Sequence, residues 1–352
     1  AGIALPKIQT IDIRKAHLKK QMIQQFAPKM LSSITETLQS GKQVILFQNR
    51  RGYSPVLSCG TCSHTPNCNY CDVILTYHKW NNQLKCHYCG YIEQVPKFCP
   101  SCSAKDFIDK GFGTEQIEES LRELLPIYVT KRMDYDTTRG KNAHQQIITD
   151  FEQGRIDILV GTQMVTKGLD FDNVALVGIL NADSMLHFPD FRAYERAFQL
   201  MMQVSGRAGR KGKQGQVLIQ TYDEEHEMFG LLKSNDYTSF IRQQIQERKL
   251  FSYPPYNRLI GITLKHKNQR KLDETANVLV GLMRKSFAAR VLGPEYPAIS
   301  KIRNYYHKNI LLKIENEASI SEAKSILYTI IEKMKNHTDY KSVRYINDVD
   351  PI

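Results

Sequence analysis

The chain has 352 residues, a formal net charge of +12 and a hydrophobic fraction of 41%. This length allows two or three domains of about 100–200 residues each, and no stretch approaches the roughly 20 apolar residues of a membrane-spanning helix, so we expect a cytoplasmic protein. The positive charge favours a polyanionic partner such as nucleic acid, although an excess of lysine can also serve solubility alone.

The first two thirds of the chain alternate short apolar runs with amphipathic segments. Residues 8–13 predict a strand, 32–38 belong to a helix, and 44–47 (VILF) are typical of a buried parallel strand. After a cysteine-rich segment, Thr114 is expected to cap a helix. The next predicted strands are 128–134, 156–162, 173–180 and 216–222, with helices at 142–153 and through Phe198 and Met202.

Strands that alternate with helices indicate a parallel α/β sheet with helices on both faces. The cysteine-rich segment interrupts this pattern, so we interpret it as an insertion anchored to the α/β core at both ends. The predicted domains are an α/β lobe over 1–233, the insertion over 58–104 within it, and a small α+β domain over 234–352.

The C-terminal part has a different character. It predicts a helix at 237–249, strands at 258–266, 307–315 and 343–350, helices at 272–288 and 319–335, and a loop at 292–300, in a βαββαβ-like order. Its basic residues are Lys265, Lys267, Arg270, Lys271, Arg284, Lys285, Arg290, Lys301, Arg303 and Lys308, with Tyr305, Tyr306 and His307 among the last of them. This mixture fits DNA binding, and a solvated helix face explains part of it equally well.

All eight cysteines fall in one segment and form C-x-x-C pairs. The pairs are Cys59/Cys62, Cys68/Cys71, Cys86/Cys89 and Cys99/Cys102. One tight turn of this kind brings two sulfurs to a tetrahedral Zn²⁺, so the pairs predict two structural zinc ions. An iron–sulfur cluster also uses four thiolates, but the paired, ribbon-like spacing argues against it. A thioredoxin-type redox pair would need one C-x-x-C beside a βαβ motif, whereas this segment has four such pairs in sequence.

The pairing of these turns follows from a predicted β-hairpin that turns at Asn81 and Asn82. The expected first site is Cys59, Cys62, Cys99 and Cys102, and the expected second site, which clasps the ends of the hairpin, is Cys68, Cys71, Cys86 and Cys89. The aromatic residues on or beside the hairpin are Tyr77, His78, Trp80 and Tyr88. They could stack on bases, or they could cover a small core that the metal stabilises.

Two further motifs lie in the α/β lobe. GTQMVTKGLDF, residues 161–171, follows an apolar strand, and the loop after a parallel strand is where α/β sheets bind ligands. QVSGRAGR, residues 203–210, holds Arg207 and Arg210 three residues apart. Guanidinium groups pair with phosphate oxygens and stabilise the charge of phosphoryl transfer. A solvated basic turn is the alternative for the second motif alone.

These two motifs resemble motifs V and VI of superfamily 2 helicases. Together with FQNRRGYSP, the cysteine insertion, GFGTEQ and DYDTT, they resemble the PriA family of primosomal replication-restart DNA helicases over essentially the whole chain. The resemblance implies a RecA-like second helicase lobe with a double zinc-ribbon-like module inserted. It also implies ATP with Mg²⁺ as cofactor, 3′-to-5′ unwinding of DNA at forks and D-loops, and contacts with single-stranded DNA-binding protein and primosome loader proteins.

The resemblance also assigns roles to residues. It places Gln203, Arg207 and Arg210 at the ATP phosphates, Gly168 and Asp170 at the nucleotide cleft, and Thr162, Gln163 and Lys167 on the DNA strand. The chain has no G-x-x-x-x-G-K-[ST] loop, which a complete motor needs, so we expect the first motor lobe to lie outside it. The sequence DEEH at 223–226 follows the arginine motif, and we interpret it as an acidic turn.

Two other hypotheses remain open at this point. The chain could be a non-enzymatic zinc-ribbon DNA adaptor whose α/β lobe is only a scaffold. It could also be a relative of RNA helicases, because the two helicase motifs alone do not distinguish DNA from RNA.

Overall fold

The computed structural model describes the chain except for residues 1–5, 50–56, 63, 71–72, 79–80, 88, 110–112, 135–136, 139, 141, 166–170, 210–213, 298 and 352. The chain divides into two compact units. The first comprises Ala1–His64, Lys97–Phe188 and Arg192–Ile241, and the second comprises Thr65–Pro96, Pro189–Phe191 and Arg242–Ile352.

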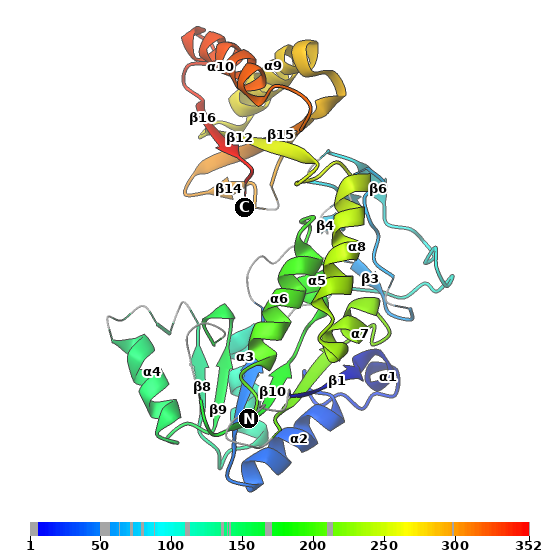
Figure 1. Ribbon diagram of the computed structural model, residues 1–352, viewed down its shortest axis with the longest axis vertical. Helices are drawn as coiled ribbons and strands as arrows, with labels where there is room; N and C mark the ends of the chain where they lie inside the picture. Colours follow the sequence, from blue (N-terminus) through cyan, green and yellow to red (C-terminus); the bar gives the residue numbers. More distant parts are fainter. Residues whose placement is uncertain are drawn as a thin grey trace. The chain divides into compact units, whose positions relative to one another are not determined.

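The first unit is built on a six-stranded sheet in the order β1-β11-β10-β2-β9-β8 (Figure 1), and every neighbouring pair in it is parallel. Its strands are β1 (Lys7–Asp12), β2 (Gln43–Phe47), β8 (Thr130–Met133), β9 (Ile158–Gly161), β10 (Val174–Ile179) and β11 (Gln216–Thr221). All five residues of β2 are buried, as expected for a central strand that helices cover on both faces. The predicted strands in this region are confirmed with small shifts at their ends.

Helices cover both faces of this sheet. The helices are α1 (Ile13–Leu18), α2 (Pro28–Gln39), α3 (Thr114–Leu124), α4 (Ala143–Glu152), α5 (Asp183–Leu186), α6 (Ala193–Ser205) and α7 (Glu227–Ser234), with a short 3₁₀ turn at Gln163–Val165. Helices α1, α2 and α3 share one hydrophobic core with the sheet, and α4, α5, α6 and α7 share another. The predicted α/β fold with helices on both faces is therefore confirmed. None of the helices in the described part of the chain has the length and hydropathy to cross a membrane.

Helix α3 begins differently from the prediction. Its N-cap is Gly113, and Thr114 is already the first helical residue. The Thr114 hydroxyl instead donates to the Asp134 carboxylate at 2.7 Å, and both side chains are buried. The prediction of Thr114 as the N-cap is wrong because a buried carboxylate at the end of β8 takes its hydroxyl.

The C-terminal part of the second unit holds an antiparallel sheet in the order β13-β15-β12-β16. Its elements are β12 (Asn257–His266), α9 (Gln269–Phe287), a 3₁₀ turn (Ala288–Arg290), β13 (Val291–Glu295), β14 (Lys301–Ile302), β15 (Tyr305–Glu315), α10 (Ile320–Asn336) and β16 (Arg344–Val349). Helix α8 (Tyr237–Leu250) precedes this domain. The expected loop at 292–300 is wrong in its first half, because β13 pairs with β15 there.

The insertion forms two small antiparallel sheets. Strands β3 (Leu57–Cys59) and β7 (Phe107–Asp109) pair at its two ends, in the first unit. Strands β4 (Thr76–His78), β5 (Gln83–Lys85) and β6 (Ile92–Gln94) form the other sheet, in the second unit. The chain turns between β4 and β5 at Asn82, whose φ is 52°, so the predicted hairpin is present.

A buried glutamine joins three parts of the first unit, and its replacement tests this packing. The Gln220 amide donates to the Gln25 and Leu180 carbonyls at 3.0 and 3.1 Å and accepts from the Ala27 N–H at 2.8 Å. Gln220→Met keeps the volume but leaves these backbone groups without a partner, so we expect a loss of about 2 kcal/mol or more in the free energy of unfolding. Urea unfolding measures it. Gln199→Met, at an exposed position of α6, is the control, and equal losses in both variants would contradict the expectation.

Candidate functional site

The cysteine turns share one backbone geometry. In each, the N–H of the first cysteine donates to the carbonyl five residues later. The four bonds are Cys59 to His64 at 2.9 Å, Cys68 to Val73 at 2.8 Å, Cys86 to Tyr91 at 2.8 Å and Cys99 to Ala104 at 2.7 Å. In the three pairs whose cysteines are both described, the two sulfurs belong to the same cluster, as a metal-binding turn requires.

Two of these turns end in the left-handed backbone region. Gly90, with φ of 84°, donates to the Cys86 carbonyl at 3.0 Å, and Ser103, with φ of 61°, donates to the Cys99 carbonyl at 2.8 Å. Glycine takes this conformation without strain, whereas a serine is held in it by its surroundings.

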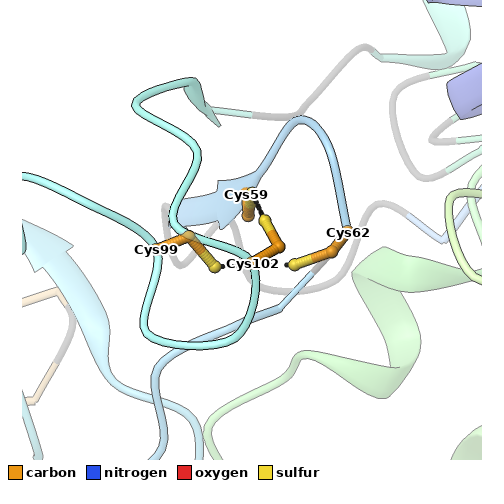
Figure 2. A group of neighbouring side chains, drawn as sticks. All are labelled: Cys59, Cys62, Cys99 and Cys102. Carbon is orange, nitrogen blue, oxygen red and sulfur yellow. Dashed lines mark hydrogen bonds between the residues drawn. The ribbon is translucent and has the colours of Figure 1, made fainter.

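The first candidate metal site is Cys59, Cys62, Cys99 and Cys102, whose sulfurs all lie within 4.8 Å of one another (Figure 2). The Cys59–Cys102 and Cys62–Cys99 sulfur separations are 3.6 and 3.5 Å. A disulfide needs about 2.05 Å, whereas four sulfurs at about 2.3 Å from a tetrahedral Zn²⁺ lie roughly 3.8 Å apart. The arrangement therefore fits a zinc ion.

The protonation of these thiols also fits a cation. Burial raises the pKa of Cys62, but the backbone N–H of His64 and the neighbouring thiols lower it, with a net value of about 7. The N–H of Ala104 lowers the pKa of Cys102, but Cys62 and burial raise it, with a net value of about 12. Crowded thiolates repel one another, so a divalent cation is what allows all four to lose their protons together.

The second candidate site holds Cys68, Cys86 and Cys89, whose sulfurs also lie within 4.8 Å of one another. The Cys68–Cys89 sulfur separation is 3.6 Å. Cys71 lies outside the described residues. The structure thus brings the cysteines together in the nested order that the hairpin predicted, with the outer pairs in one cluster and three members of the inner pairs in the other.

Two of the four aromatic residues of the hairpin are described. The Tyr77 hydroxyl donates to the Asn82 side chain at 3.1 Å, and His78 and His87 share a hydrogen bond of 3.3 Å between their Nε2 atoms. Both Tyr77 and His78 therefore make contacts inside the insertion. Trp80 and Tyr88 lie outside the described residues.

Thr162 and Gln163 lie at the carboxyl edge of the parallel sheet, directly after β9. Gly161 is needed at this turn, because a Cβ there would lie 2.1 Å from Val165 Cγ1 and 3.1 Å from the Met133 carbonyl oxygen. The Gly161 carbonyl accepts from the Gln48 N–H at 2.9 Å, which places the end of β2 beside this turn.

Arg207 lies at the opposite, amino edge of the sheet. It follows the end of α6, and two residues later the Gly209 N–H donates to the carbonyl of Val174, the first residue of β10, at 3.0 Å. Gly215 packs against this segment so closely that a Cβ would lie 2.2 Å from the Ala208 carbonyl carbon. Gln203 is exposed on α6. The remaining predicted residues of these motifs, Lys167, Gly168, Asp170 and Arg210, lie outside the described part of the chain.

Sequence reasoning missed the role of Asp134 at the carboxyl edge. Besides Thr114, its carboxylate accepts the Thr137 N–H at 3.1 Å and lies 3.5 Å from Arg132. Thr138 donates to the Asp134 carbonyl at 2.6 Å and contacts the Met164 sulfur at 3.6 Å. Asp134 thus fixes a turn beside the Gln163–Val165 segment. The signal was present in DYDTT, where an aspartate and two threonines follow a strand.

The stretch 223–226 serves local structure. Glu224 pairs with Lys15 at 3.1 Å. The Nδ1 atom of His226 accepts from the Met228 N–H at 3.2 Å and so caps α7. These contacts agree with the interpretation of this stretch as a turn.

Comparison with known families assigns most of the chain. Residues 68–93 match the PriA DNA helicase Cys-rich region domain, 93–212 match the helicase conserved C-terminal domain, and 249–352 match the primosomal protein N C-terminal domain. Among solved structures, the Pyrococcus furiosus Hef helicase domain aligns with a TM-score of 0.29 and 17% identity over 62% of this chain and 30% of that chain, a similarity too low to support a shared arrangement.

Several curated proteins are similar over nearly the whole chain. Replication restart protein PriA of Bacillus subtilis is 40% identical over 349 residues, which is 99% of this chain and 43% of that protein. The Haemophilus influenzae protein of the same name is 38% identical over 95% of this chain and 46% of that protein. The chain thus spans less than half the length of these relatives. It belongs to the PriA family of replication restart proteins and carries the family's cysteine-rich and C-terminal domains together with a helicase C-terminal domain.

Proposed function

We propose that the chain forms the second motor lobe, the zinc module and the C-terminal domain of an ATP-dependent DNA helicase that unwinds DNA 3′ to 5′ at stalled forks and D-loops. In this proposal the lobe spans 1–233, the zinc module 58–104 and the C-terminal domain 234–352. The similarity to PriA proteins over 99% of the chain supports it. The same similarity supports single-stranded DNA-binding protein and primosome loader proteins as partners.

The observation that carries the motor proposal is the separation of the two helicase motifs to opposite edges of one sheet. Thr162 and Gln163 follow β9 at the carboxyl edge, where α/β sheets present ligand-binding loops. Arg207 lies at the amino edge, beside the start of β10. We assign the DNA strand to the first group, with Lys167, and the nucleotide to the second, with Gln203, Arg210, Gly168 and Asp170.

ATP with Mg²⁺ would supply the free energy of the unwinding cycle. This chain would contribute positively charged side chains at the nucleotide. A guanidinium directed at the triphosphate stabilises the charge that develops during phosphoryl transfer. In this proposal, residues of a first motor lobe outside this chain would bind the metal and contact the phosphates.

The C-terminal sheet offers a second nucleic-acid surface. Helices α9 and α10 pack on one face, against alternate residues such as Ile262, Leu264 and Ile310. On the other face, Arg344, Lys265 and His307 form one cross-strand row through their register. Tyr305 lies two residues before His307, with the Arg344 guanidinium 4.9 Å and the Lys267 ammonium 5.7 Å from its ring centroid.

Part of this face is already occupied. Lys313 donates to the Phe251 carbonyl at 2.8 Å and lies 3.8 Å from the Tyr253 ring centroid, and Pro351 lies against Gly261. At the other end of the face, where the basic row lies, Arg344 is exposed and Tyr305 is half-buried. Rings flanked by cations are how proteins bind single strands without reading sequence, so we assign this end of the face to single-stranded DNA.

The motor assignment predicts a large effect of one arginine. Arg207→Ala in the full-length protein should lower DNA-stimulated ATP turnover by about 10³-fold or more, because an arginine at the transferred phosphate is worth about that much. DNA binding without nucleotide should stay near the wild-type value. Arg155→Ala, which removes an exposed guanidinium paired with Asp150, is the control. Unchanged turnover in Arg207→Ala would favour the non-enzymatic adaptor.

The sheet face predicts a tyrosine-dependent affinity. Tyr305→Ala should weaken single-stranded DNA binding by about 5- to 150-fold, which corresponds to the loss of one base stack of about 1–3 kcal/mol. Fluorescence anisotropy at one stated salt concentration measures it. Tyr328→Ala is the matched control, since Tyr328 is 66% exposed on α10, within the helical layer. Equal affinities of the two variants for single-stranded DNA would contradict the assignment of this face to DNA binding. In a separate measurement on the wild-type protein, tighter binding of duplex RNA than of forked DNA would favour an RNA helicase.

The cysteine clusters predict two structural zinc ions per chain. Cys99→Ser and Cys86→Ser should each lower the zinc content measured by mass spectrometry from two ions to one, because each removes a ligand from a different cluster. Native wild-type protein should show no titratable thiol. Iron in the purified protein, or two zinc ions in either variant, would contradict the assignment.

A further inference from the structure

A turn of the second cysteine cluster contacts the C-terminal domain directly. Lys85 forms an ion pair of 2.6 Å with Glu295, and the His87 Nδ1–H donates to the Tyr296 carbonyl. Lys85 and His87 flank the candidate ligand Cys86 in sequence, whereas Glu295 ends β13. The contact therefore joins segments about 200 residues apart in sequence within one compact unit.

This contact is enclosed. The Lys85 and Glu295 side chains are only 22% and 16% exposed, so water screens their attraction less than that of a surface pair. Gly90 lies against the same carboxylate, because a Cβ on it would lie 2.0 Å from Glu295 Oε1. A residue with a side chain at this place would displace Glu295.

The receiving segment is itself anchored in the C-terminal domain. The Tyr296 hydroxyl donates to Asp273 of α9 at 2.6 Å, and Lys308 of β15 donates to the same carboxylate at 2.6 Å. Lys308 also lies 4.8 Å from the Tyr296 ring centroid. A displacement of Tyr296 would therefore disturb both a helix and a central strand.

Two hydrogen bonds fix the orientation of the His87 ring. A carbonyl only accepts, so His87 Nδ1 carries its proton and Nε2 is the acceptor for His78. The ring thus bridges β4 and Tyr296, and it belongs to the turn whose backbone is closed by the Cys86 to Tyr91 hydrogen bond. Two thiolates that bind one metal ion hold such a turn in a single shape.

We infer that the second metal site acts as a latch for the C-terminal domain: metal bound at the cluster of Cys68, Cys86 and Cys89 shapes the turn that holds Glu295 and Tyr296. The latch rests on the zinc assignment proposed above. Coupling between two sites is reciprocal. Loss of the contact between Lys85 and Glu295 must therefore weaken metal binding, although Glu295 is not a ligand.

The test measures zinc release from full-length protein to an excess of a chromogenic chelator. Glu295→Lys places a second cation against Lys85, and we expect it to speed the release of one of the two zinc ions by about 5- to 150-fold, the usual range of such coupling. The other ion should leave at the wild-type rate. Lys85→Glu combined with Glu295→Lys should restore the slow release, because it rebuilds the ion pair with its charges exchanged.

Glu315→Lys is the matched control. Glu315 pairs with Arg290 at 2.7 Å on the same domain but is 44% exposed, and we expect no change in either release rate. Unchanged release in Glu295→Lys overturns the latch, as does equal acceleration of both ions that the charge exchange does not reverse. The wild-type zinc content, measured first, tests the metal assignment separately, since fewer than two ions would overturn that assignment and the latch with it.

Discussion

The insertion depends on one repeated interaction, the backbone hydrogen bond that closes each C-x-x-C turn. The strands it connects have only three residues each, and sheets this short bury too little apolar surface to be stable alone. The closed turns convert four separate loops into two sulfur clusters. A bound metal ion at each cluster would supply folding free energy that a hydrophobic core supplies elsewhere.

The parallel sheet imposes the second constraint. All carboxyl ends of its strands meet at one edge and all amino ends at the other, so a loop that joins β9 to β10 must pass from edge to edge. The motif at 161–171 lies on this path. Under the proposed assignment of nucleotide to the amino edge and DNA to the carboxyl edge, this one covalent segment would connect the two ligands. Gly161 is fixed at the first end by Val165, and Val174 at the second by Gly209.

The sequence predicted features that repeat locally. Apolar runs gave the parallel strands because a strand covered on both faces has no polar side. The C-x-x-C spacing and the hairpin turn gave the nested order of the cysteines, since both depend on neighbours in the chain. No local pattern could reveal that Thr114 bonds to Asp134 twenty residues away, because a threonine before a helical segment looks like an N-cap whatever lies opposite it.

Strand β13 also shows that tertiary pairing can override the preference of the local sequence. Its sequence VLGPE contains glycine and proline, which weaken a strand, so local propensity favoured a loop. Pairing with β15 overrides that propensity because β15 has eleven residues and offers a long edge. The contact of Glu295 and Tyr296 with the zinc turn was also beyond sequence reasoning, since it depends on where β13 ends.

The insertion is divided between the two compact units, and each cysteine cluster lies in a different one. The ligands Cys59, Cys62, Cys99 and Cys102 all belong to the first unit, and Cys68, Cys86 and Cys89 all belong to the second. Among the described cysteines, neither cluster therefore draws ligands from both units. A metal ion at either cluster would therefore bind described cysteines of one unit alone.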